Sequence, residues 1–105
     1  MARRVVFTVR SPLGYRVMLT RDRWREILRY KHPALARKEQ AVRTCVERPT
    51  MIRESAKDPA VHLYYAPAGR VHRCVVVAPA DGEERFVVTA YLTKNIKKGK
   101  ERWTS

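Results

Sequence analysis

The sequence predicts a small α+β domain, and three observations lead to that prediction. Two segments rich in β-branched and aromatic residues, 5–9 and 15–19, flank a Pro-Leu-Gly turn. Apolar residues then recur at helical spacing between about residues 21 and 48. From residue 61 onward, β-type segments alternate with short turns. We therefore expect an N-terminal β-hairpin, two short helices and an antiparallel meander.

The first helix is expected to run from about residue 21 to residue 31, with Thr20 as its cap. One face of this helix is apolar and consists of Trp24, Ile27 and Leu28. The other face is basic and consists of Arg21, Arg25 and Arg29. We expect the apolar face to pack inside the domain and the arginines to bind RNA.

A second helix is expected to begin at Pro33 and to end near Arg48, so that the two helices meet at His32. Pro49 stops this helix, and residues 50–54 read as a short strand. The meander that follows has strands over residues 61–66, 71–78 and 85–91. Three successive valines in its middle strand predict cover on both faces of the sheet.

A chain of 105 residues has too little apolar surface to divide between two cores, so residues 1–105 are expected to form one domain. Residues 94–105 are basic and polar, with Trp103 as their only anchor. We expect this tail to fray unless RNA or the core holds it.

The net charge of +13 predicts a polyanionic partner. A positive field of this size attracts nucleic acid, and the affinity falls as the salt concentration rises. The alternative is a solvated basic surface without a specific partner. A hydrophobic fraction of 45% argues against disorder along the whole chain.

Cys45 and Cys74 stand far apart, each beside valine, and are expected to be core residues in a reducing cytosol. The three histidines show no metal-ligand spacing, so neither a metal nor another cofactor is expected. The apolar run near the N-terminus is too short for a signal peptide or a membrane span. These features predict a cytoplasmic protein without a membrane partner.

Thr89 and Tyr91 are two residues apart on an expected strand, so both side chains should project from one face. Three lysines follow at once, Lys94, Lys97 and Lys98. Hydroxyl groups beside lysine ammonium groups are suited to binding a phosphate.

Cleaving RNA without a metal requires a base, an acid and cations around the phosphorus that the 2′-hydroxyl attacks. The ordinary pKa of a histidine side chain, about 6.5, suits proton transfer at neutral pH, so His32 is the candidate proton-transfer residue. Arg53 is the candidate cation that stabilises the charge of the transition state.

Each of these residues has a structural alternative. A His-Pro pair often simply starts a helix, and a Thr-x-Tyr strand often simply packs. Tyr64 is a candidate to stack on an exposed RNA base, although tyrosines in sheets more often pack inside. Arg53 can equally be a solvated arginine.

The order of these features resembles the phage-associated branch of the barnase, EndoU, colicin and RelE-like nuclease superfamily. The resemblance covers about residues 20–100. It rests on Trp24 in a helix, on His32-Pro33, and on the segment from Pro49 to Ser55. It also rests on the later pattern Tyr64-Tyr65, Val75–Val77 and Phe86–Tyr91.

The resemblance implies helices packed on a curved antiparallel sheet of about four strands, whose open face binds RNA. It implies a metal-independent endoribonuclease, phage-derived or toxin-like, with an acidic inhibitor or antitoxin as a protein partner. Carried over by position, His32 becomes the proton-transfer residue, and Thr89 and Tyr91 the late-strand hydroxyl pair.

One departure from the family pattern concerns catalysis. The family carries a second histidine just after the helix tryptophan, where this chain has Arg25 and Glu26. Glu26 can serve as the base if its surroundings set its pKa suitably. Otherwise the protein is a non-catalytic RNA-binding module that retains the fold and the basic face. A third reading is an interaction protein whose basic face meets an acidic inhibitor.

Overall fold

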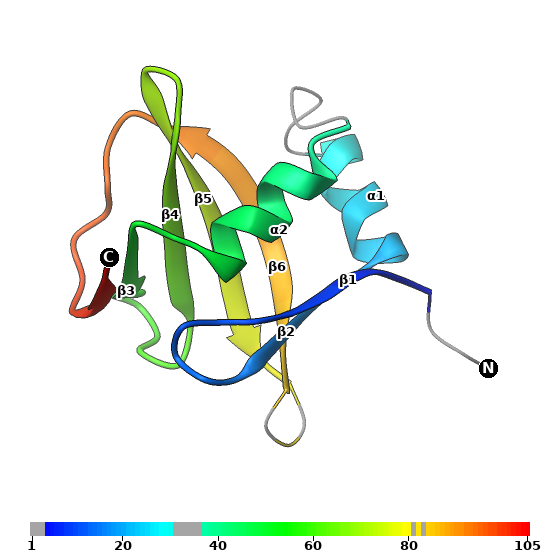
Figure 1. The fold of residues 1–105 in the computed structure, drawn as a ribbon, viewed down its shortest axis with the longest axis horizontal. Helices are drawn as coiled ribbons and strands as arrows, with labels where there is room; N and C mark the ends of the chain where they lie inside the picture. The colour runs from blue at the N-terminus through cyan, green and yellow to red at the C-terminus, as the bar shows by residue number, and fades with distance from the viewer. Residues whose placement is uncertain (1–3, 31–36, 81, 83) are drawn as a thin grey trace.

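The computed structural model describes residues 4–30, 37–80, 82 and 84–105, and the α+β class predicted from the sequence is confirmed (Figure 1). The strands are β1 (Val5–Arg10), β2 (Arg16–Thr20), β3 (Met51–Glu54), β4 (His62–Ala68), β5 (Val71–Pro79), β6 (Glu84–Thr93) and β7 (Glu101–Thr104). The helices are α1 (Arg21–Tyr30) and α2 (Glu39–Glu47).

Across the described residues the strands form one sheet in the order β1-β2-β6-β5-β4-β3-β7. The meander β4-β5-β6 is antiparallel as predicted. The expectation of about four strands in an antiparallel sheet is wrong, because the N-terminal hairpin joins the same sheet. It does so through a parallel pairing of β2 with β6 over Arg16–Met18, which makes the sheet mixed.

Part of the basic tail, residues 101–104, forms strand β7, so the core holds the tail through Trp103, which is one of the two alternatives expected from the sequence. Strand β7 pairs antiparallel with β3, and Trp103 lies opposite Ile52 and packs against the core. The backbone N–H of Glu54 also donates to the carbonyl of Lys100 at 2.8 Å. Burial of the indole and these backbone bonds together offset the entropy lost on ordering the chain end.

The start of α1 and the end of α2 follow the signals expected from the sequence. The Thr20 hydroxyl caps α1 by accepting a hydrogen bond from the Arg23 N–H at 3.2 Å, and Trp24 and Ile27 are buried. Helix α2 ends at Glu47, before Pro49. The second helix was expected to run from Pro33, but α2 begins at Glu39, because the backbone of Arg37 has a φ of 64° and leaves the helical conformation there. Pro33 and His32 themselves lie outside the described residues. No helix in the described ranges is long and apolar enough to cross a membrane.

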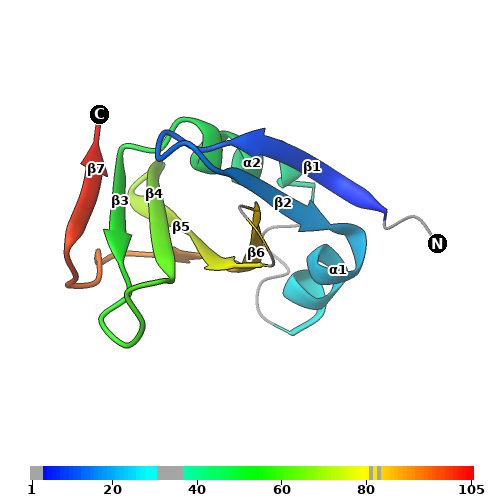
Figure 2. The ribbon, with the colours of Figure 1, turned by 90° about the horizontal axis from the view of Figure 1, so that it is seen from below.

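The main core lies between α2 and one face of the sheet (Figures 1 and 2). Three α2 residues contribute to it, Val42, Cys45 and Val46, and all three are buried. A smaller cluster, Leu63, Tyr65 and Cys74, lies on the opposite side of the strands. We call the side that carries this smaller cluster the open face.

A chain of buried hydrogen bonds holds the turn between β1 and β2 against β4. The Ser11 Oγ lies 2.5 Å from the Tyr64 hydroxyl, which donates to the Tyr15 hydroxyl at 2.5 Å. The Tyr15 hydroxyl in turn lies 2.6 Å from Nδ1 of His62. Each hydroxyl can donate once and accept once if His62 is neutral and Nδ1 accepts. Burial is the main cause that lowers the pKa of His62, followed by the charge of Arg85.

We predict that Gly99→Ala destabilises the protein by about 1–3 kcal/mol, the usual range for overpacking. A Cβ at Gly99 would collide with the backbone carbonyl of Glu54, at the place where the chain returns to form β7. Urea unfolding measures the change. Lys100→Ala is the matched control, since its side chain is exposed in the same segment. Equal stability of both variants would contradict the close approach.

We also predict that His62→Gln reduces the stability lost between pH 7 and pH 5. Because the folded state lowers the pKa of His62, the unfolded chain binds more protons as pH falls through its ordinary pKa of about 6.5. The parent protein therefore loses stability as pH falls, and the variant lacks this contribution. Urea unfolding at both pH values is the measurement. Identical losses in parent and variant would show that His62 is not held neutral.

Candidate functional site

A bulge in β6 decides which side chains reach the open face. Val77 pairs with Val87, but the preceding residue of β5, Val76, pairs with Thr89, so Val88 is an extra residue. Val87 and Ala90 consequently both enter the main core, although they are three residues apart. Thr89 instead lies in register with Val76 and Leu63, and Tyr91 in register with Cys74 and Tyr65.

Thr89 and Tyr91 therefore open onto the same cavity, as the sequence predicted. The cavity has a volume of about 580 Å³. We call it the Thr89 cavity, and its lining residues are Ser55, Ala56, Lys57, Val61, Leu63, Val76, Thr89, Tyr91, Lys97 and Lys98. Its floor is apolar and its polar groups are hydroxyls and lysines. No carboxylate or imidazole belongs to the described lining.

The Thr89 hydroxyl has an unusual environment. Its oxygen is buried, and no described group forms a hydrogen bond with it. A buried hydroxyl without a partner costs about 1–3 kcal/mol, and most such groups in proteins are paired. This hydroxyl is therefore the candidate group for a hydrogen bond with a ligand in the cavity.

Tyr91 is held by two neighbours in the same part of the open face. Burial raises the pKa of its hydroxyl, and so does the hydrogen bond with the Cys74 thiol. The ammonium of Lys97 lies 5.5 Å from the centre of the Tyr91 ring, in a cation–π arrangement. Tyr91 is thus a protonated hydrogen-bond donor at neutral pH, and not a base.

The segment after β6 brings the lysines to the cavity. The backbone N–H of Lys97 donates to the Tyr65 hydroxyl at 3.1 Å, and Ile96 packs against the cluster of the open face. These contacts fix the chain direction, so that Lys97 and Lys98 line the cavity. Lys94 is exposed and lies outside the lining. Two of the three predicted lysines therefore reach the candidate site.

Several predicted site residues lie elsewhere. Arg53 shares a row of the open face with Thr89, but two strands lie between them, and its guanidinium donates to the Gly99 carbonyl at 3.5 Å. Glu26 forms an ion pair with Arg23 at 3.1 Å and does not line the Thr89 cavity. Arg53, the predicted transition-state cation, and Glu26, the alternative base, thus interact with other groups of the protein.

The basic face of α1 is exposed, as the sequence predicted. Arg21, Arg25 and Arg29 are exposed, and Arg21 and Arg25 line a different cavity, beside the start of the helix. Sequence periodicity identified this face but gave no indication of the strands that border it. The predicted base His32 lies outside the described residues.

The expectation that Tyr64 stacks on RNA is wrong. Tyr64 is 0% exposed, lies in the main core and forms the hydrogen bonds with Ser11 and Tyr15. Its neighbour Tyr65 lies on the other face, but the segment after β6 covers its hydroxyl. The two adjacent tyrosines therefore stabilise the two sides of the sheet, and neither ring is free for a base.

Both cysteines are buried, as predicted, and neither is a nucleophile at neutral pH. Burial raises the pKa of Cys45 to about 12 and also raises the pKa of Cys74. Within the described ranges, no group of three or more His, Cys, Asp or Glu residues is placed to hold a metal ion. The polar groups in the described lining of the Thr89 cavity are hydroxyls and lysine ammonium groups.

The chain was compared with known protein families, proteins and structures. No family model, no curated protein and no solved structure matches the chain.

We predict that Thr89→Val stabilises the protein by about 1 kcal/mol, because it removes a buried hydroxyl that lacks a partner and nearly preserves the side-chain shape. Thr50→Val is the matched control. The Thr50 hydroxyl donates to the Tyr65 carbonyl at 3.1 Å, so its removal is expected to destabilise the protein. Urea unfolding measures both changes. A loss of stability in Thr89→Val comparable to that in Thr50→Val would mean that the Thr89 hydroxyl is paired.

Proposed function

We propose that this protein is a small metal-independent endoribonuclease that binds single-stranded RNA on its open face. The observation that carries the proposal is the unpartnered Thr89 hydroxyl in a cavity lined by Lys97 and Lys98. A phosphodiester oxygen accepts a hydrogen bond from the hydroxyl, and its negative charge attracts the ammonium groups. The net charge of +13 favours capture of a polyanion before this contact forms.

The proposed reaction is an internal transfer within RNA. The 2′-oxygen attacks the neighbouring phosphorus and the bond to the 5′-oxygen breaks, which leaves a 2′,3′-cyclic phosphate and a 5′-hydroxyl. His32 takes the proton from the 2′-hydroxyl, and a protonated group beside the phosphate donates one to the leaving oxygen. Thr89 and Lys97 stabilise the charge on the phosphoryl oxygens. Tyr91 is the candidate donor, because burial raises its pKa and keeps it protonated at neutral pH, although the same shift makes it a weak acid.

The resemblance to the phage-associated nucleases supports the same proposal. It adds a toxin-like role in the cytoplasm, with an acidic inhibitor or antitoxin as the protein partner. The exposed basic face of α1 has the charge that such a partner would complement.

A second candidate is a non-catalytic RNA-binding module. The observation in its favour is that the described lining of the Thr89 cavity holds neither a histidine nor a carboxylate. Glu26, which stands where the family pattern has a histidine, is ion-paired with Arg23. Binding of phosphate needs only the hydroxyl and the lysines, whereas cleavage also needs a group that accepts the proton.

Cleavage is tested by incubating labelled single-stranded RNA with the purified protein in the presence of a chelator. We predict products that end in a 2′,3′-cyclic phosphate from the wild type and none from His32→Ala, which should still bind the RNA. Thr89→Val should cleave about 100-fold more slowly, the usual effect of losing one donor to the transition state. Thr8→Val, an exposed threonine on β1, is the matched control and should cleave like the wild type.

The outcomes separate the two candidates. Absence of cyclic-phosphate product from the wild type would overturn the nuclease proposal. If binding of the same RNA then depends on salt and is weakened in Lys97→Ala and Lys98→Ala, the binding-module proposal takes its place. If neither lysine substitution changes RNA binding, the Thr89 cavity is not a phosphate site and both candidates are wrong.

A further inference from the structure

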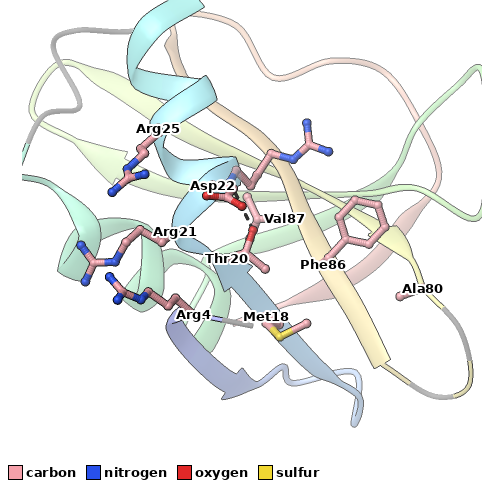
Figure 3. Close-up of a pocket in the computed structure, with 10 residues that line it drawn as sticks. Arg4, Met18, Thr20, Arg21, Asp22, Arg25, Ala80, Phe86 and Val87 are labelled. Carbon is pink, nitrogen blue, oxygen red and sulfur yellow. Dashed lines mark hydrogen bonds between the residues drawn. The ribbon is translucent and has the colours of Figure 1, made fainter. Parts of the chain in front are cut away.

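A second and larger cavity borders β6, with a volume of about 730 Å³ (Figure 3). It lies between the first turn of α1 and strands β2 and β6. Strand β2 pairs with β6 over only three residues, Arg16–Met18, and then leads directly into α1. The two strands therefore separate, and the gap exposes Met18 and Phe86. We call this gap the arginine cavity, after the side chains along its other side.

The basic side of the arginine cavity is formed by Arg4, Arg21 and Arg25. The backbone N–H of Arg21 donates to the Arg4 carbonyl at 3.1 Å, which brings these two residues together. In Figure 3 the three guanidinium groups extend to the same side of α1. None of the three forms an ion pair with a described residue, whereas Arg23 is paired with Glu26. Asp22 is the one acidic residue in the described lining.

The apolar part of the lining consists of Met18, Ala80, Phe86 and Val87. Phe86 lies in register with Met18 on β2 and Ala78 on β5, and Figure 3 shows its ring beside β6, away from the three guanidinium groups. The bulge at Val88 gives Phe86 and Thr89 the same orientation, toward the open face. At the rise of an extended strand, these two residues are about 10 Å apart. The two cavities therefore follow one another along β6.

A nucleotide matches the division of the arginine cavity into two parts. Its phosphate suits guanidinium groups, and its base can stack on a phenylalanine ring. An acidic peptide would satisfy the arginines, but it would fill the apolar part only where an apolar side chain follows at the right spacing, whereas every nucleotide carries a ring beside its phosphate. At a rise of about 3.4 Å per stacked nucleotide, a separation of about 10 Å corresponds to two or three nucleotides.

We infer that an RNA strand runs along β6, with one phosphate in the Thr89 cavity and a flanking nucleotide two or three positions away in the arginine cavity. The base of that nucleotide stacks on Phe86, and Arg21 and Arg25 bind its phosphates, with Arg4 beside them. This inference rests on the proposed binding of RNA to the open face. It adds the path of the RNA along β6, a second subsite and a minimum length for tight binding.

The test is binding of fluorescent single-stranded RNA to the His32→Ala protein, which avoids cleavage. A dinucleotide reaches only one cavity, whereas a hexanucleotide reaches both. Arg21→Gln/Arg25→Gln should bind the hexanucleotide about tenfold more weakly, with a slope of affinity against salt that is smaller by about 1.4, or 0.7 for each lost phosphate contact. Phe86→Leu should weaken hexanucleotide binding about tenfold through lost stacking, with the salt slope unchanged.

The matched control is Arg48→Gln/Arg70→Gln, which removes the same charge from two exposed positions that line neither cavity. It should keep the hexanucleotide affinity within about twofold of the parent, because neither residue contacts a cavity that the RNA is proposed to occupy, and exposed charges are screened by salt. Equal weakening by both double substitutions would mean that only overall charge matters, and would overturn the inference. So would polyglutamate that binds as tightly as the hexanucleotide at equal charge, because that result would indicate an acidic protein partner.

Failure of this inference can be distinguished from failure of the proposed function. If wild-type protein cleaves RNA and the dinucleotide and hexanucleotide are cleaved with equal kcat/KM, the nuclease proposal stands and the second subsite does not exist. If nothing is cleaved but Arg21→Gln/Arg25→Gln removes the gain in affinity between dinucleotide and hexanucleotide, the subsite is supported and the nuclease proposal fails.

Discussion

The extra residue Val88 in β6 is the constraint on which the candidate site depends. In a regular strand, Val87 and Thr89 would share one face, and Ala90 would lie on the other. The bulge breaks this alternation, so Val87 and Ala90 both pack in the core while Thr89 pairs with Val76 on the open face. Without it, β6 would have to bury either a hydroxyl in the core or an apolar side chain in the cavity. One inserted residue therefore satisfies the core and the polar surface together.

The parts of the fold that local signals encode were predictable from the sequence. The cap at Thr20, the stop at Pro49 and the turns of the meander each depend on a few neighbouring residues. The parallel pairing of β2 with β6 and the pairing of β3 with β7 join segments that are remote in the chain. The periodicity of the sequence does not predict such pairings, because they depend on which strand edges lie next to one another in the folded domain. For this reason the sequence predicts about four strands, whereas the sheet has seven among the described residues.

The candidate site was predictable to a similar extent. The two-residue spacing of Thr89 and Tyr91 fixed their common face, since no bulge falls between them. Phe86 could not be placed on the same face, because the bulge lies between it and Thr89. The sequence makes Tyr64 a candidate for RNA contact, because the alternation of side chains along a strand defines two faces but does not identify the face that α2 covers. Only the packed tertiary structure makes that distinction.

Unbalanced charge connects the fold to its proposed function. The described residues contain two ion pairs, Arg23 with Glu26 and Arg102 with Glu54, against a net charge of +13 for the chain. Most of the positive charge is therefore neutralised by solvent and counterions, and its self-repulsion opposes the compact state. A bound polyanion would reduce that repulsion and supply a partner for the Thr89 hydroxyl at the same time. Both features lower the stability of the free protein, and the proposed RNA ligand would relieve both.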